Sequence, residues 1–129
     1  MVYQGPERRR FERVAVELTI TYHVHKPISI RMMVGNTQVG AKTFDLSEGG
    51  MAITTSRDIP ISSILLMKFT LVDKTQTPHA MSITGQVRYN ILIKHEEHRL
   101  GIDFTQIKKE DKTIIADFVK TALNDKKTS

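Results

Sequence analysis

The sequence predicts an all-β domain of about six or seven short antiparallel strands, arranged as a small barrel or sandwich and followed by one amphipathic helix. Two observations predict this class. Apolar and polar residues alternate in successive runs, and turn-like segments such as GNTQ, SEGG and DKTQTP separate these runs. Beyond about residue 107 the spacing of the apolar residues changes to that of a helix. A length of 129 residues fits a single domain, 1–129, with a modest core.

The first predicted strands lie between residues 14 and 55. The run 14–22 is typical of a half-buried strand, because its alternate residues are apolar: Val14, Val16, Leu18, Ile20 and Tyr22. The run 28–34 alternates less strictly, and we expect a second strand there, with a turn at 35–38. An extended segment at 39–47 and a short strand at 51–55 follow on either side of SEGG.

The later predicted strands are longer and richer in apolar residues. One covers 62–72, and the next covers 81–93. Gly85 lies inside the second of these, and an interior glycine there indicates a bulge or a close contact. The last strand is predicted at 99–104, where Leu100, Ile102 and Phe104 alternate with Arg99, Gly101 and Asp103.

A C-terminal helix is predicted at about 108–124. Its apolar residues form one helical stripe: Ile114, Ile115, Phe118, Val119, Ala122 and Leu123. Glu110 and Asp111 lie in its first turn, where the helix dipole favours negative charge. We expect a β-domain over about 14–105 with this helix packed on its surface, preceded by an arm at 1–13.

The composition excludes several classes of protein. The chain has no Cys, which excludes disulfides, thiolate metal ligands and a cysteine nucleophile. Its longest apolar run, ILLM at 64–67, is far shorter than the roughly 20 residues of a membrane helix. The first residues lack the apolar core of a signal peptide. We therefore expect a cytoplasmic protein that does not insert into a membrane.

The arginines are clustered, and the clustering indicates an anionic ligand. Lys and Arg number 19 against 14 Asp and Glu, which gives a net charge of +5. Four of the eight arginines fall at 8–13, whereas the lysines are scattered. A guanidinium binds phosphate or a guanine edge through two parallel hydrogen bonds, which a lysine cannot do. Taken alone, however, such a cluster is as typical of a solvated arm or a charged strand edge.

The segment DLSEGG, residues 45–50, is the second unusual stretch. Asp45 and Ser47 are two residues apart, so an extended backbone directs both side chains to the same face. Gly49 and Gly50 allow another molecule to approach the backbone closely. Taken alone, a plain turn between two strands is the better explanation of the same residues.

Together, the two stretches resemble the paired signature of the PilZ domain family, which here reads Arg8-Arg9-x-x-x-Arg13, then a strand, then Asp45-x-Ser47-x-x-Gly50. GQVRY, HRLGIDF and the C-terminal helix look like the closing part of that family, so the resemblance extends from about residue 7 to residue 123. It implies a six-stranded antiparallel PilZ-type barrel. For most members it also implies binding of the bacterial second messenger cyclic di-GMP as ligand, with no other cofactor and no metal.

The resemblance assigns roles that the chemistry of cyclic di-GMP makes reasonable. Arginines pair with phosphates and also bind guanine O6 and N7, whereas an aspartate suits the guanine N–H donors. By resemblance, Arg9 and Arg13 supply the main phosphate and guanine contacts, and Asp45, Ser47 and Gly50 lie across from them. Gly49 and Gly50 leave room for a flat base. Arg8, just before the motif, is associated in this family with binding an intercalated dimer of the ligand.

A mechanism of signalling follows from the resemblance. The arm at 1–13 has little apolar content, so we expect it to be mobile without ligand and ordered by ligand phosphates. The new surface would act on a separate, unidentified partner protein. The 31 residues between Arg13 and Asp45 look longer than is usual for the family. We place the surplus in 23–40, either as a lengthened strand pair or as a partner-contacting surface centred on RMMV.

Three other functions remain as alternatives. An enzyme is poorly supported, because Ser47 lies in no nucleophile pattern and no His has the spacing of a triad or a zinc site. A barrel that binds single-stranded nucleic acid fits the charge, but the chain lacks Trp and has few aromatic residues for stacking, so a nucleic-acid partner is not expected. A PilZ-fold interaction module without ligand is the third alternative, although the motif residues are all present.

Overall fold

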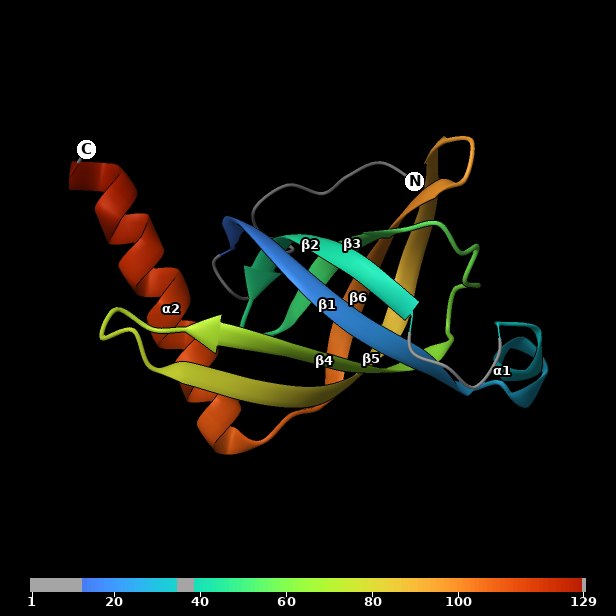
Figure 1. Cartoon of the computed structure of the whole chain (residues 1–129), viewed down its shortest axis with the longest axis horizontal. Coiled ribbons are helices and arrows are strands. Elements are labelled where there is room, and N and C mark those ends of the chain that lie inside the picture. The colour runs from blue at the N-terminus through green and yellow to red at the C-terminus, as the bar shows by residue number, and fades with distance from the viewer. Residues whose placement is uncertain (1–12, 35–38, 129) are drawn as a thin grey trace.

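The computed structural model describes residues 13–34 and 39–128 (Figure 1). In chain order the elements are β1 (Val14–Lys26), α1 (Ile28–Val34), β2 (Val39–Ser47), β3 (Gly50–Thr55), β4 (Ile64–Val72), β5 (Pro78–Lys94), β6 (Glu97–Gln106) and α2 (Lys109–Thr128). The strands pair in the order β1-β2-β3-β6-β5-β4 and form a closed barrel, with every pairing antiparallel. The predicted six-stranded barrel with a C-terminal helix is therefore confirmed.

Strand β1 closes the barrel because it pairs with two different neighbours along its length. Its first part pairs with β2, up to Tyr22 opposite Val39, and its second part pairs with β4, from Thr21 opposite Lys68. The alternation expected at 14–22 is confirmed, since Ile20 and Tyr22 are buried whereas Glu17 and Thr19 are exposed. Burial of the alternate apolar side chains stabilises this register, because a slip of one residue would turn them all to solvent.

The core fills the barrel and continues under α2. Each strand contributes buried apolar side chains, and α2 adds Ile115 and Val119 from its predicted stripe. The buried Tyr22 hydroxyl forms a 2.8 Å hydrogen bond with Thr55 Oγ1, which satisfies both polar groups inside the barrel. Figure 1 shows α2 beside one end of the barrel and α1 at the other. Over the described ranges, neither helix has the length and apolarity needed to cross a membrane.

The strand predicted at 28–34 is wrong, because these residues form α1. The carbonyl oxygen of Pro27 accepts hydrogen bonds from the Ile30 and Arg31 amides, at 3.2 and 3.0 Å, and so opens a helical turn. Ile30 then packs against the core, whereas Ile28 and Met32 point away from it. A short apolar run does not distinguish a strand from a helix by its spacing. The part of the 23–40 segment at 35–38 lies outside the described residues.

The irregularity predicted at Gly85 is confirmed. The pairing of β5 with β6 shifts register between Thr84 and Gly85. A Cβ at this position would lie within 3 Å of the side chains of Ile102 and Met67 and of the Asp103 carbonyl oxygen. A glycine therefore lets β5 pass close to β6 at a bulge.

Candidate functional site

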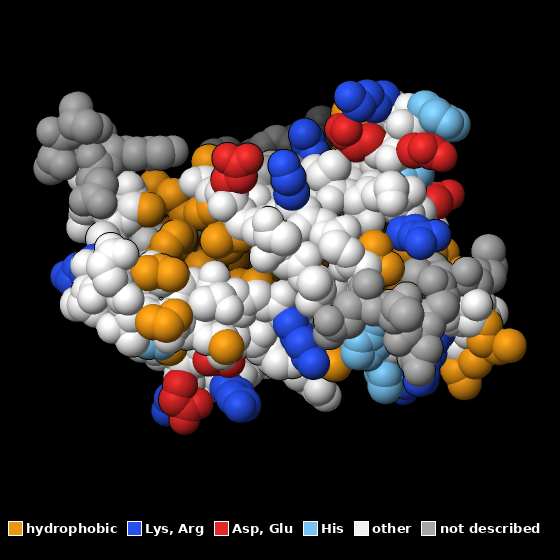
Figure 2. All heavy atoms as spheres, in the orientation of Figure 1, with side chains coloured by type: hydrophobic (Ala, Val, Ile, Leu, Met, Phe, Trp, Pro, Cys, Tyr) orange, Lys and Arg blue, Asp and Glu red, His pale blue; other side chains and the backbone are white. Residues whose placement is uncertain are grey.

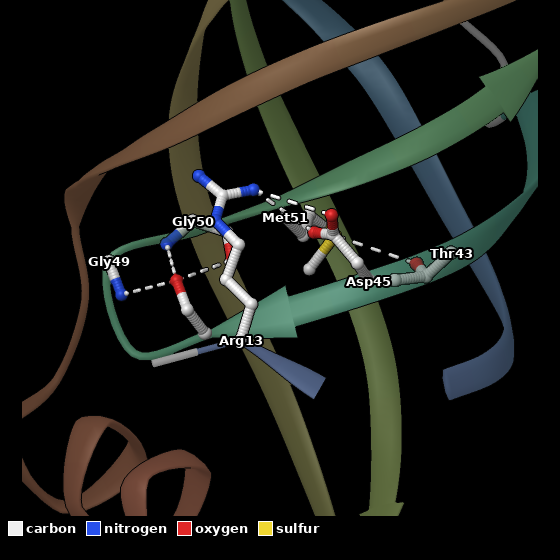
Figure 3. Close-up of polar contacts among 7 residues, drawn as sticks. Arg13, Thr43, Asp45, Gly49, Gly50 and Met51 are labelled. Carbon is white, nitrogen blue, oxygen red and sulfur yellow. Dashed lines mark hydrogen bonds and ion pairs between the residues drawn. The ribbon is translucent and has the colours of Figure 1, made fainter. Parts of the chain in front are cut away.

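The turn between β2 and β3 is held by Ser47. Its Oγ accepts hydrogen bonds from the amides of Gly49 and Gly50, both at 3.2 Å, and donates to the Gly50 carbonyl oxygen at 3.3 Å (Figure 3). The Ser47 residue is only 3% exposed. The hydroxyl is therefore used by its own turn, in the manner of a serine side chain that caps a backbone turn.

Gly49 and Gly50 attach this turn to β6. Gly50 pairs with Asp103, and a Cβ on Gly50 would overlap the carbonyl oxygen of Ile102. The Gly49 carbonyl oxygen accepts a 2.9 Å hydrogen bond from the Phe104 amide. The close approach of two backbones explains the glycine at position 50 without reference to a ligand.

Asp45 faces outward because β2 contains a bulge. Thr43 and Leu46 are both fully buried although they are three residues apart, and the pairing with β3 shifts register between Thr43 and Asp45. Strict alternation from Thr43 would direct Asp45 into the core. The extra residue instead reverses the alternation and brings the carboxylate to the surface.

Arg13 meets Asp45 at this surface. Its Nη1 lies 3.2 Å from Asp45 Oδ1 and 3.4 Å from Oδ2. Ala15, two residues after Arg13, pairs with Asp45 across the β1–β2 ladder, and Figure 3 shows the guanidinium reaching across that ladder beside the Gly49–Gly50 turn. The two side chains are 31% and 26% exposed. Such an ion pair is open enough for a ligand to reach both partners, and its own contribution to stability is small.

A line of cross-strand neighbours runs from this pair across three further strands. Asp45 pairs with Ala52, Ala52 with Gly101, and Gly101 with Tyr89. A Cβ on Gly101 would overlap the Tyr89 ring, so the ring lies directly against the backbone of β6. Ala52 is 0% exposed and Gly101 is buried, so only the two ends of this line, Asp45 and Tyr89, reach solvent. We call Asp45, Ala52, Gly101 and Tyr89 the outer strip.

Sequence reasoning missed the outer strip. The sequence predicted GQVRY and RLGIDF only to be strands. A glycine inside an alternating strand, such as Gly101, does indicate a close contact at that position. The contact between the Tyr89 ring and Gly101 can be predicted only if the pairing register of the two strands is known, because the two residues are twelve positions apart in the chain. The register is shifted by a bulge between Val87 and Tyr89, which no sequence pattern indicates.

The structure brings five of the predicted site residues together, namely Arg13, Asp45, Ser47, Gly49 and Gly50. Arg8 and Arg9, with the rest of the predicted arm before Arg13, lie outside the described residues. The histidines form no metal site in the part of the chain that the structure describes, where no group of three or more His, Asp or Glu residues is placed to hold an ion. His98, for example, instead bonds Asn90, with Nδ1 2.9 Å from Asn90 Oδ1.

The fold and the site define a small closed β-barrel that presents an arginine–carboxylate pair on its outer surface. A family model of the PilZ domain matches residues 7–121. The chain therefore belongs to the PilZ domain family. A search of curated proteins finds no match.

Solved structures share this fold at low sequence identity. MotI/DgrA from Bacillus subtilis, an inhibitor of motility, is 14% identical with a TM-score of 0.77, and the match covers 98% of this chain and 58% of that one. The PilZ domain of YcgR from Escherichia coli, solved with c-di-GMP, is 12% identical with a TM-score of 0.66, over 94% and 95%. The MrkH–c-di-GMP complex of K. pneumonia is 16% identical with a TM-score of 0.63, over 96% and 57%. The chain thus spans little more than half the length of two of these relatives.

Proposed function

We propose that this PilZ domain is a receptor for cyclic di-GMP, which binds on the outer face of the barrel. The observation that carries the proposal is the exposed Arg13–Asp45 pair beside the 47–50 turn. Two relatives of the same fold, YcgR and MrkH, were solved with this ligand, which supports the choice of nucleotide. The role is that of a binding module without catalytic activity.

The two charges of the pair suit the two parts of the ligand. The Arg13 guanidinium binds a phosphodiester or the O6 and N7 edge of a guanine. The Asp45 carboxylate is repelled by phosphate, so it accepts hydrogen bonds from the guanine N–H groups instead. In the absence of ligand the two side chains neutralise each other, and binding exchanges this weak ion pair for charge-assisted contacts with the nucleotide.

The two ends of the outer strip offer places for bases. Ala52 is 0% exposed and the Tyr89 ring covers Gly101, so the exposed groups are the Asp45 carboxylate at one end and Tyr89, 37% exposed, at the other. A base stacked on an aromatic ring gains about 1–3 kcal/mol. Three strand spacings of about 4.8 Å separate Asp45 from Tyr89. One guanine of the ligand would therefore meet Asp45 with its edge, and the other would stack on Tyr89.

The remaining motif residues have two different roles in this proposal. Ser47, Gly49 and Gly50 are positioning residues that fix the turn beside Asp45. Arg8 and Arg9 would bind ligand phosphates, with Arg8 serving a second, intercalated ligand molecule. Binding would order the arm and create a surface for a separate partner protein.

Calorimetric titration with cyclic di-GMP tests the proposal. We expect micromolar or tighter binding, reduced at least about tenfold by Arg13→Ala, because a hydrogen bond to a charged group contributes about 1.5–3 kcal/mol. Asp45→Ala should reduce the preference for cyclic di-GMP over cyclic di-AMP, since adenine lacks the N1–H donor. Arg31→Ala and Asp117→Ala, on the helices, serve as matched controls.

The outcomes distinguish the proposal from its alternatives. Two ligands per chain would support the role of Arg8, and one ligand would remove it. Tyr89→Ala should weaken binding, whereas Tyr89→Phe should not, because the phenyl ring keeps the stacking surface. Absence of binding by the intact chain would reject the receptor and leave an interaction module of PilZ fold.

A further inference from the structure

We propose that the surface around α1 is a docking site for an acidic, apolar peptide segment of a partner protein. The surface consists of Lys26, Pro27, Ile28, Arg31, Met32 and the loop at 60–63, and we call it the α1 platform. It goes beyond the proposed signalling role, in which ligand binding creates the partner surface, by naming a second surface and the chemistry of the partner that it fits. Docking here needs no nucleotide, so it is tested separately from ligand binding.

Exposed aliphatic side chains mark the platform. Ile28 is 67% exposed, Met32 is 77% exposed and Ile61 is 60% exposed. Ile28 and Met32 are four residues apart on α1 and therefore share one face of the helix. Figure 2 shows hydrophobic side chains gathered over α1, at the right of the view. Exposed aliphatic groups that gather in this way indicate an interaction surface, whereas single ones do not.

A groove connects α1 to the 60–63 loop. It has a volume of about 670 Å³ and lies between Pro27 and Ile28 on one side and Pro60 and Ile61 on the other, with Ile64 and Gln86 of the barrel also in its lining. This volume is within the usual range for sites that enclose several side chains. A concave site of this kind fits the side chains of a polypeptide better than it fits the flat surface of a bilayer.

The charged side chains around the groove indicate which kind of peptide it would bind. Lys26 lines the groove, and none of the described residues that line it is Asp or Glu. Arg31 lies one turn after Ile28 on α1. Burial lowers the pKa of His23, and the positive charges of Arg31, Lys68 and His25 lower it further, so several cations gather on this side of the barrel. An apolar groove with a basic rim is complementary to an apolar segment flanked by Asp and Glu.

The closing experiment selects peptides from a random display library on the full 129-residue chain in the absence of nucleotide. Selected peptides are synthesised and titrated by fluorescence anisotropy. We expect them to combine large apolar residues with Asp or Glu. The double variant Ile28→Ser with Met32→Ser, and separately Lys26→Glu, should weaken their binding at least about tenfold. These side chains are exposed, so the variants should fold normally.

Matched controls and a second probe make the result decisive. Leu92→Ser removes an aliphatic side chain of similar exposure, 63%, on the β5–β6 hairpin, and Lys120→Glu reverses a charge on α2; both should leave peptide binding unchanged. Failure to select a peptide, selection of basic peptides, or binding indifferent to the platform variants would overturn the proposal. Sedimentation of the chain with phosphatidylglycerol vesicles, lost in the Met32→Ser variant, would also overturn it in favour of a membrane surface. Because these outcomes are measured without nucleotide, none of them bears on the ligand proposal.

Discussion

Ser47 shows how the side chain of a motif residue can be used within its own turn. Its hydroxyl accepts two amide hydrogen bonds and donates one, all within the turn that follows β2. From the sequence, this role of Ser47 could not be distinguished from a direct contact with a ligand. The spacing shows only that Ser47 and Asp45 lie on the same face of a strand. The difference lies in the direction of the hydroxyl, which only the folded turn defines.

Replacing Ser47 with Ala should therefore lower stability as well as affinity. The Gly49 and Gly50 amides would lose their acceptor, and a buried unsatisfied donor costs about 1–3 kcal/mol. Urea denaturation measures the loss, and Ser82→Ala, at an exposed position on β5, is the control. A Ser47→Ala domain of unchanged stability but abolished ligand binding would contradict the positioning role.

A second prediction at the scale of single residues concerns Gly50. In Gly50→Ala the new methyl group would overlap the Ile102 carbonyl oxygen, which belongs to backbone and cannot rotate away. We expect destabilisation of about 1–3 kcal/mol, typical of overpacking, with a lower midpoint in thermal unfolding. Gly40→Ala is the matched control, because nothing lies within 4 Å of a Cβ there. Equal midpoints for the two variants would refute the packing explanation.

At the scale of elements, the sequence predicted the strands well and the connections poorly. The alternation of β1 and the helical stripe of α2 were readable because each runs over several turns or pleats with one buried face. The prediction of a strand at α1 was wrong. The segment has only seven residues, and its apolar positions fit the spacing of a helix as well as that of a strand. The bulges that turn Asp45 outward and bring Tyr89 to Gly101 depend on pairing between distant strands, and local sequence does not encode them.

The β4–β5 hairpin carries a prediction about pH. Asp73 Oδ1 accepts hydrogen bonds from Thr75 and Thr77 in the turn, and Oδ2 lies 2.8 Å from His79 Nε2. The Thr75 hydroxyl, then the His79 ring, and then the Thr77 amide hold the pKa of Asp73 below its usual value. The folded state therefore binds this proton less readily than the unfolded state, and the hairpin is most stable above the ordinary pKa of an aspartate.

Acidification below that ordinary pKa should destabilise the native chain, with a smaller loss in Asp73→Asn. Thermal unfolding midpoints measured across acidic pH test this difference. Asp117→Asn, on the exposed side of α2, should show the same acid dependence as the native chain. A native chain and an Asp73→Asn variant with parallel profiles would show that the turn hydrogen bonds do not stabilise the fold.

At the scale of the whole molecule, the two proposed sites occupy different parts of the barrel. The ligand site lies on the outer surface of β2, β3, β6 and β5, whereas the α1 platform lies at the end of β1 and the entry to β4. Closure of the barrel makes the strands between them a common rigid frame, since β1 pairs with β2 along one part and with β4 along another. If both proposals hold, we expect a nucleotide and a partner peptide to bind the same molecule together.

The most direct test of the ligand site is a map of amide chemical-shift changes in labelled protein titrated with cyclic di-GMP. We predict that the largest changes fall at Asp45, the 47–50 turn, Gly101 and Tyr89, while α1 and the 73–79 turn stay unchanged. Changes confined to α1 or to α2, or no changes at saturating ligand, would contradict a nucleotide site on the outer strip.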